Sequence, residues 1–267
     1  MHIVLYAETL FHIGPIPITN SFIMMIVVMS LLLIVFSLGA RRITENPKSA
    51  GRFGGVIEMI VSFLLNLVET TAGRKLGRQI FPLVSGLFIF ILFANFSGLL
   101  PGVGSITAGE HHVPIMRPPT ADLNMTLAMS TTTFLAVQVF GVRAHGVGGR
   151  LKHMADPAFI FPIEVISEFS RIISLGARLF GNVFAGEVLL GVGYAIANAV
   201  KIAVLPVLLP VVFIGLEVLF GTIQALVFAL LTLIYIFLAA NTHGHDDEEH
   251  AEDHAHAEAA KTAVAGD

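Results

Sequence analysis

Long runs without a charged residue constrain this chain more than any other feature. Residues 18–40, 80–100 and 123–142 contain no Asp, Glu, Lys or Arg, and a largely apolar stretch follows at 161–240. A helix needs about 20 such residues to cross about 30 Å of hydrocarbon. Charged residues make up only 13% of the chain, against about 25% in a typical soluble domain. The sequence therefore predicts an all-α integral membrane protein. The absence of cysteine excludes a disulfide-built secreted domain.

One membrane domain is expected over residues 1–242, followed by a tail. Its helices are predicted near 18–40, 53–73, 79–100, 120–142, 158–197 and 203–240. The tail, 243–267, carries eight Asp or Glu, one Lys and several His residues. Such a composition could bind a metal ion, but its high charge favours a disordered acidic tail.

The distribution of Lys and Arg predicts the orientation in the membrane. Basic residues gather in 41–52, 74–78 and 143–152, whereas 1–17 has none. By the positive-inside rule these three stretches are cytoplasmic loops, with the N-terminus outside and the C-terminus inside. The segment 53–73 then has both ends inside, which favours an amphipathic helix at the interface over the alternative, an ordinary spanning helix.

The last two helices are too long to stand upright in a bilayer. At 1.5 Å per residue, helices over 162–197 and 203–240 would measure about 54 and about 57 Å. We expect them to lie steeply tilted, to break, or to extend beyond the membrane.

A polar stripe in the first of these long helices calls for an explanation. Six polar residues fall within about 80° of the helix surface: Glu164, Glu168, Arg171, Ser174, Arg178 and Asn182. One charge at mid-membrane costs at least about 2.5–3.5 kcal/mol. Arg171 can pair with an acid on its own helix, but Arg178 has none three or four residues away. Its countercharge must come from another helix or chain, which favours a functional role.

Two further acids suggest a second polar region. Glu187 lies nine residues after Arg178 and therefore faces the opposite side of the helix. On the last helix, Glu217, Gln224 and Tyr235 share one face. If Glu187 and Glu217 meet, the pair could hold a proton near neutral pH. The alternative is two isolated, protonated glutamates in the core.

Three motifs carry a resemblance to a known family. Residues 174–187 read SLGARLFGNVFAGE, residues 119–127 read PTADLNMTL, and Gln224-Ala-Leu-Val-Phe precedes Tyr235. In their order and spacing along the chain, these motifs resemble subunit a of the F-type ATP synthase, the stator half of its membrane proton motor. One position departs from some members, which have histidine in place of Glu217.

The resemblance implies a role for each motif residue. Arg178 would face the passing carboxylate of the rotor and prevent a direct proton leak between two half-channels. The outer half-channel would be lined or bordered by Asp122, Asn124, Asn182, Glu187, Glu217 and Gln224. The inner half-channel would be lined by Glu164, Ser167 and Glu168.

The resemblance also implies the partners and the location. The partners would be a rotor ring of c subunits, peripheral-stalk b subunits, the soluble ATPase head and the lipid bilayer of a bacterial plasma membrane. The chain contains no nucleotide-binding motif, so it would not be an enzyme by itself. No cofactor, metal or nucleic acid is expected.

Two other functions would fit a polar membrane protein. A secondary proton-coupled transporter would be built from two related halves, but this chain shows no internal repeat. A purely structural membrane anchor would leave Arg178 unexplained. Copurification with a ring of small proteins and an ATPase head would distinguish the motor subunit from both.

Overall fold

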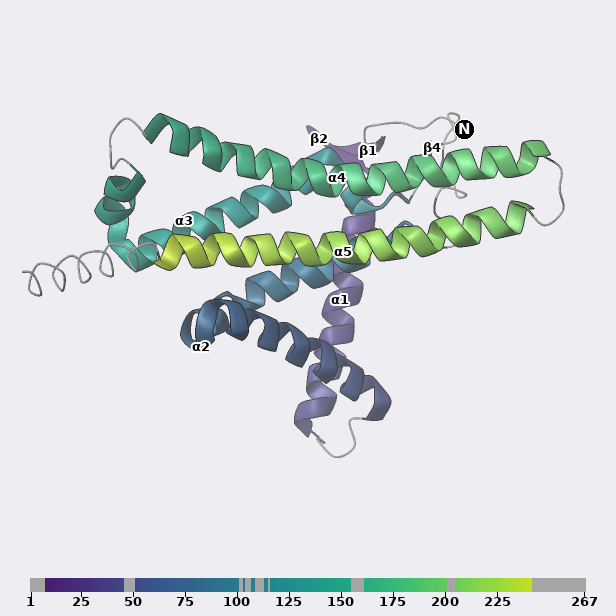
Figure 1. The fold of residues 1–267 in the computed structure, drawn as a ribbon. Helices are drawn as coiled ribbons and strands as arrows, with labels where there is room; N and C mark the ends of the chain where they lie inside the picture. The colour runs from purple at the N-terminus through teal and green to yellow at the C-terminus, as the bar shows by residue number, and fades with distance from the viewer. Residues whose placement is uncertain are drawn as a thin grey trace, which may run out of the picture.

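Five long helices dominate the computed structural model (Figure 1). It describes residues 8–45, 51–100, 103, 107–108, 113–114, 116–154, 161–200 and 205–241. The helices are α1 (Asn20–Glu45), α2 (Gly51–Ser97), α3 (Leu123–Met154), α4 (Phe161–Val200) and α5 (Leu205–Asn241). Each contains a window long and apolar enough to cross a membrane, which confirms the predicted fold class. The predicted acidic tail, 243–267, lies outside the described residues.

The shorter elements precede α1 and α3. Strands β1 (Thr9–Ile13) and β2 (Ile16–Thr19) form an antiparallel hairpin that leads into α1. Strands β3 (Thr107–Ala108) and β4 (Val113–Pro114) pair in the α2–α3 connection. A 3-10 turn, η2 (Pro119–Ala121), follows them, and all three of its residues are buried.

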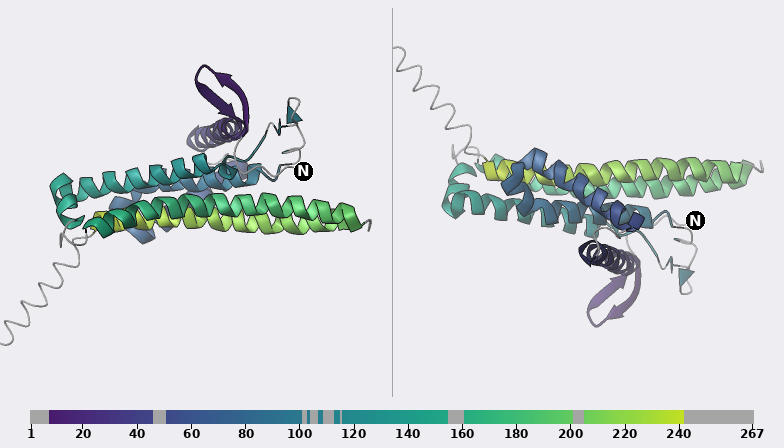
Figure 2. Two further views of the ribbon diagram at one scale, coloured as in Figure 1. Left: turned by 90° about the horizontal axis from the view of Figure 1, so that it is seen from above. Right: turned by 90° about the horizontal axis from the view of Figure 1, so that it is seen from below.

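The last two helices, α4 and α5, run side by side in opposite directions (Figures 1 and 2). Helix α1 stands across this pair. If α1 spans a bilayer upright, α4 and α5 therefore lie strongly tilted. Their 40 and 37 residues correspond to about 60 and about 55 Å, so the tilt agrees with the length argument from the sequence.

Helix α2 consists of two helical segments that meet at a sharp bend at Gly73. The backbone of Gly73 is non-helical, with a φ of 74°, a conformation that glycine adopts without strain. After the bend, Gly77 packs against the backbone of Val68, and Arg78 donates a hydrogen bond to Glu69 at 2.8 Å. The basic stretch 74–78, expected to be a loop, is therefore helical and follows the bend directly. The basic residues of 143–152 likewise lie within α3, which bends at Gly146.

The core lies between α2, α3, α4 and α5. Its fully buried side chains include Ile91, Leu179, Phe228 and Leu233. Small residues allow close approach: Gly176 lies against Ser130 of α3, and Gly193 against the ring of Phe213 on α5. One buried polar contact, between the hydroxyls of Thr133 and Thr232 at 3.2 Å, also joins α3 to α5.

Candidate functional site

Arg178 lies on the exposed face of α4, opposite the face that packs into the core. Ser174, Ala177 and Gly181 are exposed beside it, whereas Leu175 and Leu179 are buried. No ion pair or hydrogen bond joins Arg178 to any other described residue. Because a guanidinium is always charged in proteins, the described part of the chain presents an uncompensated cation on this face.

Much of the exposed surface of α4 and α5 is apolar. On α4, Ile166, Ile173, Leu189 and Val192 are between 42% and 68% exposed. On α5, the exposed apolar side chains include Val211, Val212, Leu219, Phe220 and Ile223. Exposed apolar patches of this extent mark a membrane or protein contact surface. Arg178 is thus an exposed cation on a pair of helices whose outer surface is largely apolar.

Glu187 faces away from this surface, as the helix geometry predicts. Its Oε2 accepts a hydrogen bond at 3.2 Å from Nη2 of Arg117, in the α2–α3 connection. The arginine side chain is 9% exposed and the glutamate side chain 26%. The helical repeat places Glu187 on the side of α4 opposite Arg178. There it pairs with Arg117, 70 positions earlier in the chain.

Glu217 of α5 lies next to Glu187 in space. A Cβ placed on Gly186 would lie only 2.8 Å from Oε1 of Glu217, so its carboxylate packs directly against this glycine. Two carboxylates brought close together disfavour ionisation of both. Oε2 of Glu217 is buried and has no hydrogen-bond partner among the described residues. The carboxylate of Glu217 therefore packs against the residue next to Glu187 in the chain.

Two further buried amides lie on α5 and α2, Gln224 and Asn95. Both side chains are buried, and Nδ2 of Asn95 donates a hydrogen bond at 3.0 Å to the carbonyl of Gly221. Within the described structure, Nε2 of Gln224 and Oδ1 of Asn95 have no hydrogen-bond partner. Buried polar atoms are nearly always paired with protein or water. Such unpaired buried atoms are suited to holding water.

The remaining residues predicted for the outer half-channel differ in their surroundings. Asp122 is buried and caps α3, since its Oδ1 accepts a hydrogen bond at 3.0 Å from the backbone of Asn124. This gives Asp122 a structural task at a helix start. The side chain of Asn124 is exposed, and that of Asn182 is half-buried.

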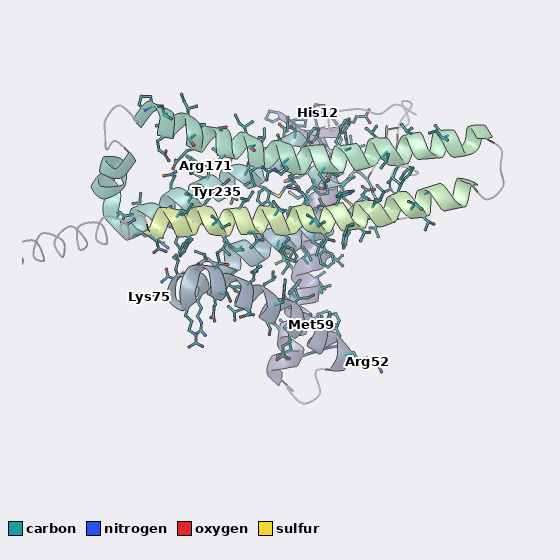
Figure 3. The ribbon with its side chains drawn as sticks, viewed as in Figure 1. His12, Arg52, Met59, Lys75, Arg171 and Tyr235 are labelled. Atoms are coloured by element: carbon teal, nitrogen blue, oxygen red, sulfur yellow. The ribbon has the colours of Figure 1, made fainter. Side chains whose placement is uncertain are left out.

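The residues predicted for the inner half-channel cluster near the start of α4. Arg171 forms an ion pair with Glu164 at 3.9 Å, and its guanidinium lies 5.4 Å from the ring centre of Tyr235. Figure 3 shows Arg171 and Tyr235 approaching each other from α4 and α5. Glu168 is buried and accepts a hydrogen bond from Gln138 of α3.

Two openings border this inner cluster. A groove of about 390 Å³ is lined by Ile163, Ile166, Ser167, Ser170, Arg171, Ser174 and Tyr235. A cavity of about 20 Å³, enough for one water molecule, has Ser130, Thr133, Glu168, Arg171 and Tyr235 as its polar lining. Arg171 and Tyr235 belong to both. They therefore separate the buried carboxylate of Glu168 from the open groove.

Comparisons with known proteins agree with the motifs. The family described as ATP synthase A chain matches residues 22–237. The chain belongs to the ATP synthase A chain family. It is 40% identical over 237 residues to the ATP synthase subunit a of Moorella thermoacetica, covering 88% of this chain and 96% of that protein. It is 34% identical over 239 residues to the ATP synthase subunit a 2 of a Bradyrhizobium strain, covering 89% and 96%.

Membership of the ATP synthase A chain family establishes the general function. The family is the non-catalytic, proton-channel stator subunit in the membrane sector of the F-type ATP synthase. The chain is therefore an integral membrane protein that works within the ATP synthase complex. This favours the stator subunit over the alternative of a secondary transporter.

Three residues in these clusters were not singled out from the sequence: Asn95, Arg117 and Gln138. Each is a polar residue in an unusual place. Asn95 interrupts an apolar run, Gln138 lies in another, and Arg117 is the one basic residue of 101–119. Their partners lie between 30 and 126 positions away in the chain.

Proposed function

We propose that Arg178 is the fixed cation that faces the carboxylate of each passing subunit in the rotor ring. The observation that carries the proposal is its position, exposed and unpaired within the described structure beside the small residues Ser174, Ala177 and Gly181 of α4. A countercharge brought by another chain would complete the site. A cation beside a carboxyl group typically lowers its pKa by about 1–3 units, which favours release of the proton as the rotor passes.

Protons reach the rotor through an outer half-channel on the other side of α4. The acids Glu187 and Glu217, with the amides Gln224 and Asn182, line it, and Asp122 and Asn124 border its mouth. The buried, unpaired polar atoms of Glu217 and Gln224 support this path, because they provide sites for water or a transferred proton.

Protons leave through an inner half-channel near the start of α4. The groove with Ser167, Ser174 and Tyr235 along its wall supports this assignment. Glu164 and the buried Glu168 are the carboxylates at this end. Arg178 lies between the two regions along α4, so a proton cannot pass directly without crossing a fixed positive charge.

Rotation follows from the separation of the two half-channels. A protonated rotor carboxyl group enters the lipid and returns to Arg178 only after nearly a full turn. Each proton that crosses 100 mV provides about 2.3 kcal/mol. The chain itself performs no nucleotide chemistry. Proton flow through its two half-channels makes the rotor turn in one direction.

The basic segments support a particular arrangement in the membrane. With 41–52, 74–78 and 143–152 inside, the N-terminal hairpin lies outside and α5 ends on the cytoplasmic side of a bacterial plasma membrane. The first part of α2, which exposes Phe53, Met59 and Phe63, lies at the inner interface. The partners are the ring of c subunits along α4 and α5, the peripheral-stalk b subunits and the soluble ATPase head.

The test replaces Arg178 in the assembled complex. We expect Arg178→Ala to abolish proton-driven ATP synthesis in membrane vesicles and Arg178→Lys to reduce it strongly. The control is Arg143→Ala, since Arg143 is also exposed and, within the described part of the chain, its guanidinium interacts with the ring of Phe140 on its own helix. Normal synthesis by Arg178→Ala at wild-type amounts of the complex would refute the proposal.

A further inference from the structure

Arg117 is buried although it lies in the α2–α3 connection. It is 7% exposed, and the residues that follow it, Pro118 to Asp122, are all buried. Burying a charge is costly unless the charge is paired and hydrogen-bonded. The chain therefore folds this connection into the protein with a charge that needs a carboxylate.

The carboxylate is that of Glu187, 70 positions later in the chain. Nη2 of Arg117 donates to Oε2 of Glu187 at 3.2 Å. The ion pair is formed through Nη2 of the guanidinium, 3.2 Å from Oε2 of the carboxylate. A lysine ammonium also supplies a positive charge and a hydrogen-bond donor, so it can retain this contact.

Glu217 is the other charged group that faces Glu187, and its situation differs. Its carboxylate packs against Gly186, and its Oε2 has no hydrogen-bond partner in the described part of the chain. When two carboxylates interact, a cation beside one of them decides which keeps the negative charge. Arg117 lies beside Glu187.

We infer that Arg117 is a positioning residue that fixes Glu187 as the ion-paired acid, which leaves Glu217 as the carboxyl group that passes the proton inward. This inference rests on the proposed function, in which both acids line the outer half-channel. Glu187 orients water at the entrance and stays ionised. Glu217 binds a proton from that water on one face and releases it toward Arg178, so it returns to its starting state in every cycle.

The test measures passive proton conduction through the membrane sector in vesicles stripped of the ATPase head, over a range of pH. Conduction is compared at equal amounts of the chain. We expect Arg117→Gln to lower conduction about tenfold and to displace its pH profile. Arg117→Lys, which retains the charge and a donor, should stay within about twofold of the wild type.

A double variant separates positioning from proton transfer. With Arg117→Gln and Glu187→Gln together, the charge of Glu187 is removed along with the cation that pairs with it, and two amides can still hydrogen-bond. We expect it to conduct several-fold better than Arg117→Gln alone, while Glu217→Gln conducts none. Should Arg117→Gln fail to accumulate, the double variant is compared instead with Glu187→Gln, and equal conduction by the two supports the inference.

The control variant is Arg78→Gln, which removes the exposed ion pair with Glu69. The side chain of Arg78 is 64% exposed, and exposed pairs contribute little, so conduction should not change. The inference is overturned if Arg117→Gln conducts normally with an unchanged pH profile, if Arg117→Lys is as impaired as Arg117→Gln, or if the double variant conducts less than Arg117→Gln. ATP synthesis by Arg178→Ala is measured in parallel. Its loss supports the proposed function independently of the result for Arg117.

Discussion

Replacing Gly186 with alanine is expected to slow proton conduction, because the added methyl group would displace the carboxylate of Glu217. The new Cβ would lie 2.8 Å from Oε1 and 2.9 Å from Cδ of that side chain. Ordinary contact begins near 3.4 Å, so the carboxylate must move by several tenths of an ångström. A misplacement of about 1 Å can cost a reaction about 100-fold. For this smaller movement we expect a loss of about tenfold.

The matched control is Gly193→Ala, about two turns further along α4. Its Cβ would lie 2.5 Å from the ring of Phe213, so it overpacks the same pair of helices without touching a carboxylate. Overpacking of this kind costs about 1–3 kcal/mol of stability. Both variants should therefore lower the thermal stability of the solubilised complex, but Gly186→Ala alone should slow passive proton conduction per assembled complex.

A second substitution tests the cause. Glu217→Asp shortens the side chain by one carbon–carbon bond, about 1.5 Å, and makes room for the methyl group. Combined with Gly186→Ala it should conduct better than Gly186→Ala alone. The reasoning is refuted if Gly186→Ala conducts normally, or if Gly193→Ala loses as much conduction at equal amounts of complex.

Three further substitutions test separate features. Gly73→Ala places a side chain at a φ of 74° and should destabilise the solubilised protein by about 1–2 kcal/mol. Gly55→Ala, in a helix with open space around it, should not. Equal melting temperatures of the two variants would contradict the bend at Gly73. Asp122→Ala removes the cap of α3 and should reduce the amount of assembled chain, while Asp122→Asn keeps a good cap; equal loss in both would assign the effect to the charge. Gln138→Leu removes a hydrogen bond to Glu168 and should slow ATP synthesis several-fold without loss of assembly, and unchanged synthesis would exclude a role for that contact.

Much of the fold follows from length and charge along the chain. The tilt of α4 and α5 is predictable because each residue adds a fixed 1.5 Å and no bilayer is thick enough for the sum. The bend of α2 has a local cause in Gly73, but the basic residues after it led to the expectation of a loop. Those residues are good helix formers, and charge alone does not end a helix.

The helical repeat predicted which residues share a side of α4, but not what each side meets. Arg178 and Glu187 face opposite ways, as nine residues of helix require. Within the stripe of about 80°, however, Glu168 is buried against α3 while Ser174 is exposed. An arc that wide crosses the boundary between packed and open surface, and periodicity does not locate that boundary.

The partners of the buried polar groups could not be predicted from the sequence. Arg117 meets Glu187 across 70 positions, and Asn95 meets Gly221 across 126. Such contacts depend on how helices cross, which no local pattern encodes. The sequence does show which groups need a partner, because burying a lone arginine or asparagine in an apolar setting without one costs free energy.

The exposed position of Arg178 has a consequence for the assembly of the complex. Alone in a bilayer, the chain would hold this guanidinium against lipid, at a cost of at least about 2.5–3.5 kcal/mol. A partner that supplies a carboxylate removes that cost, which corresponds to at least about a 100-fold stronger association. The charge that keeps protons from leaking thus also makes the unassembled subunit the less stable form. Cells that produce this chain in excess should therefore degrade the surplus rather than accumulate an open proton path.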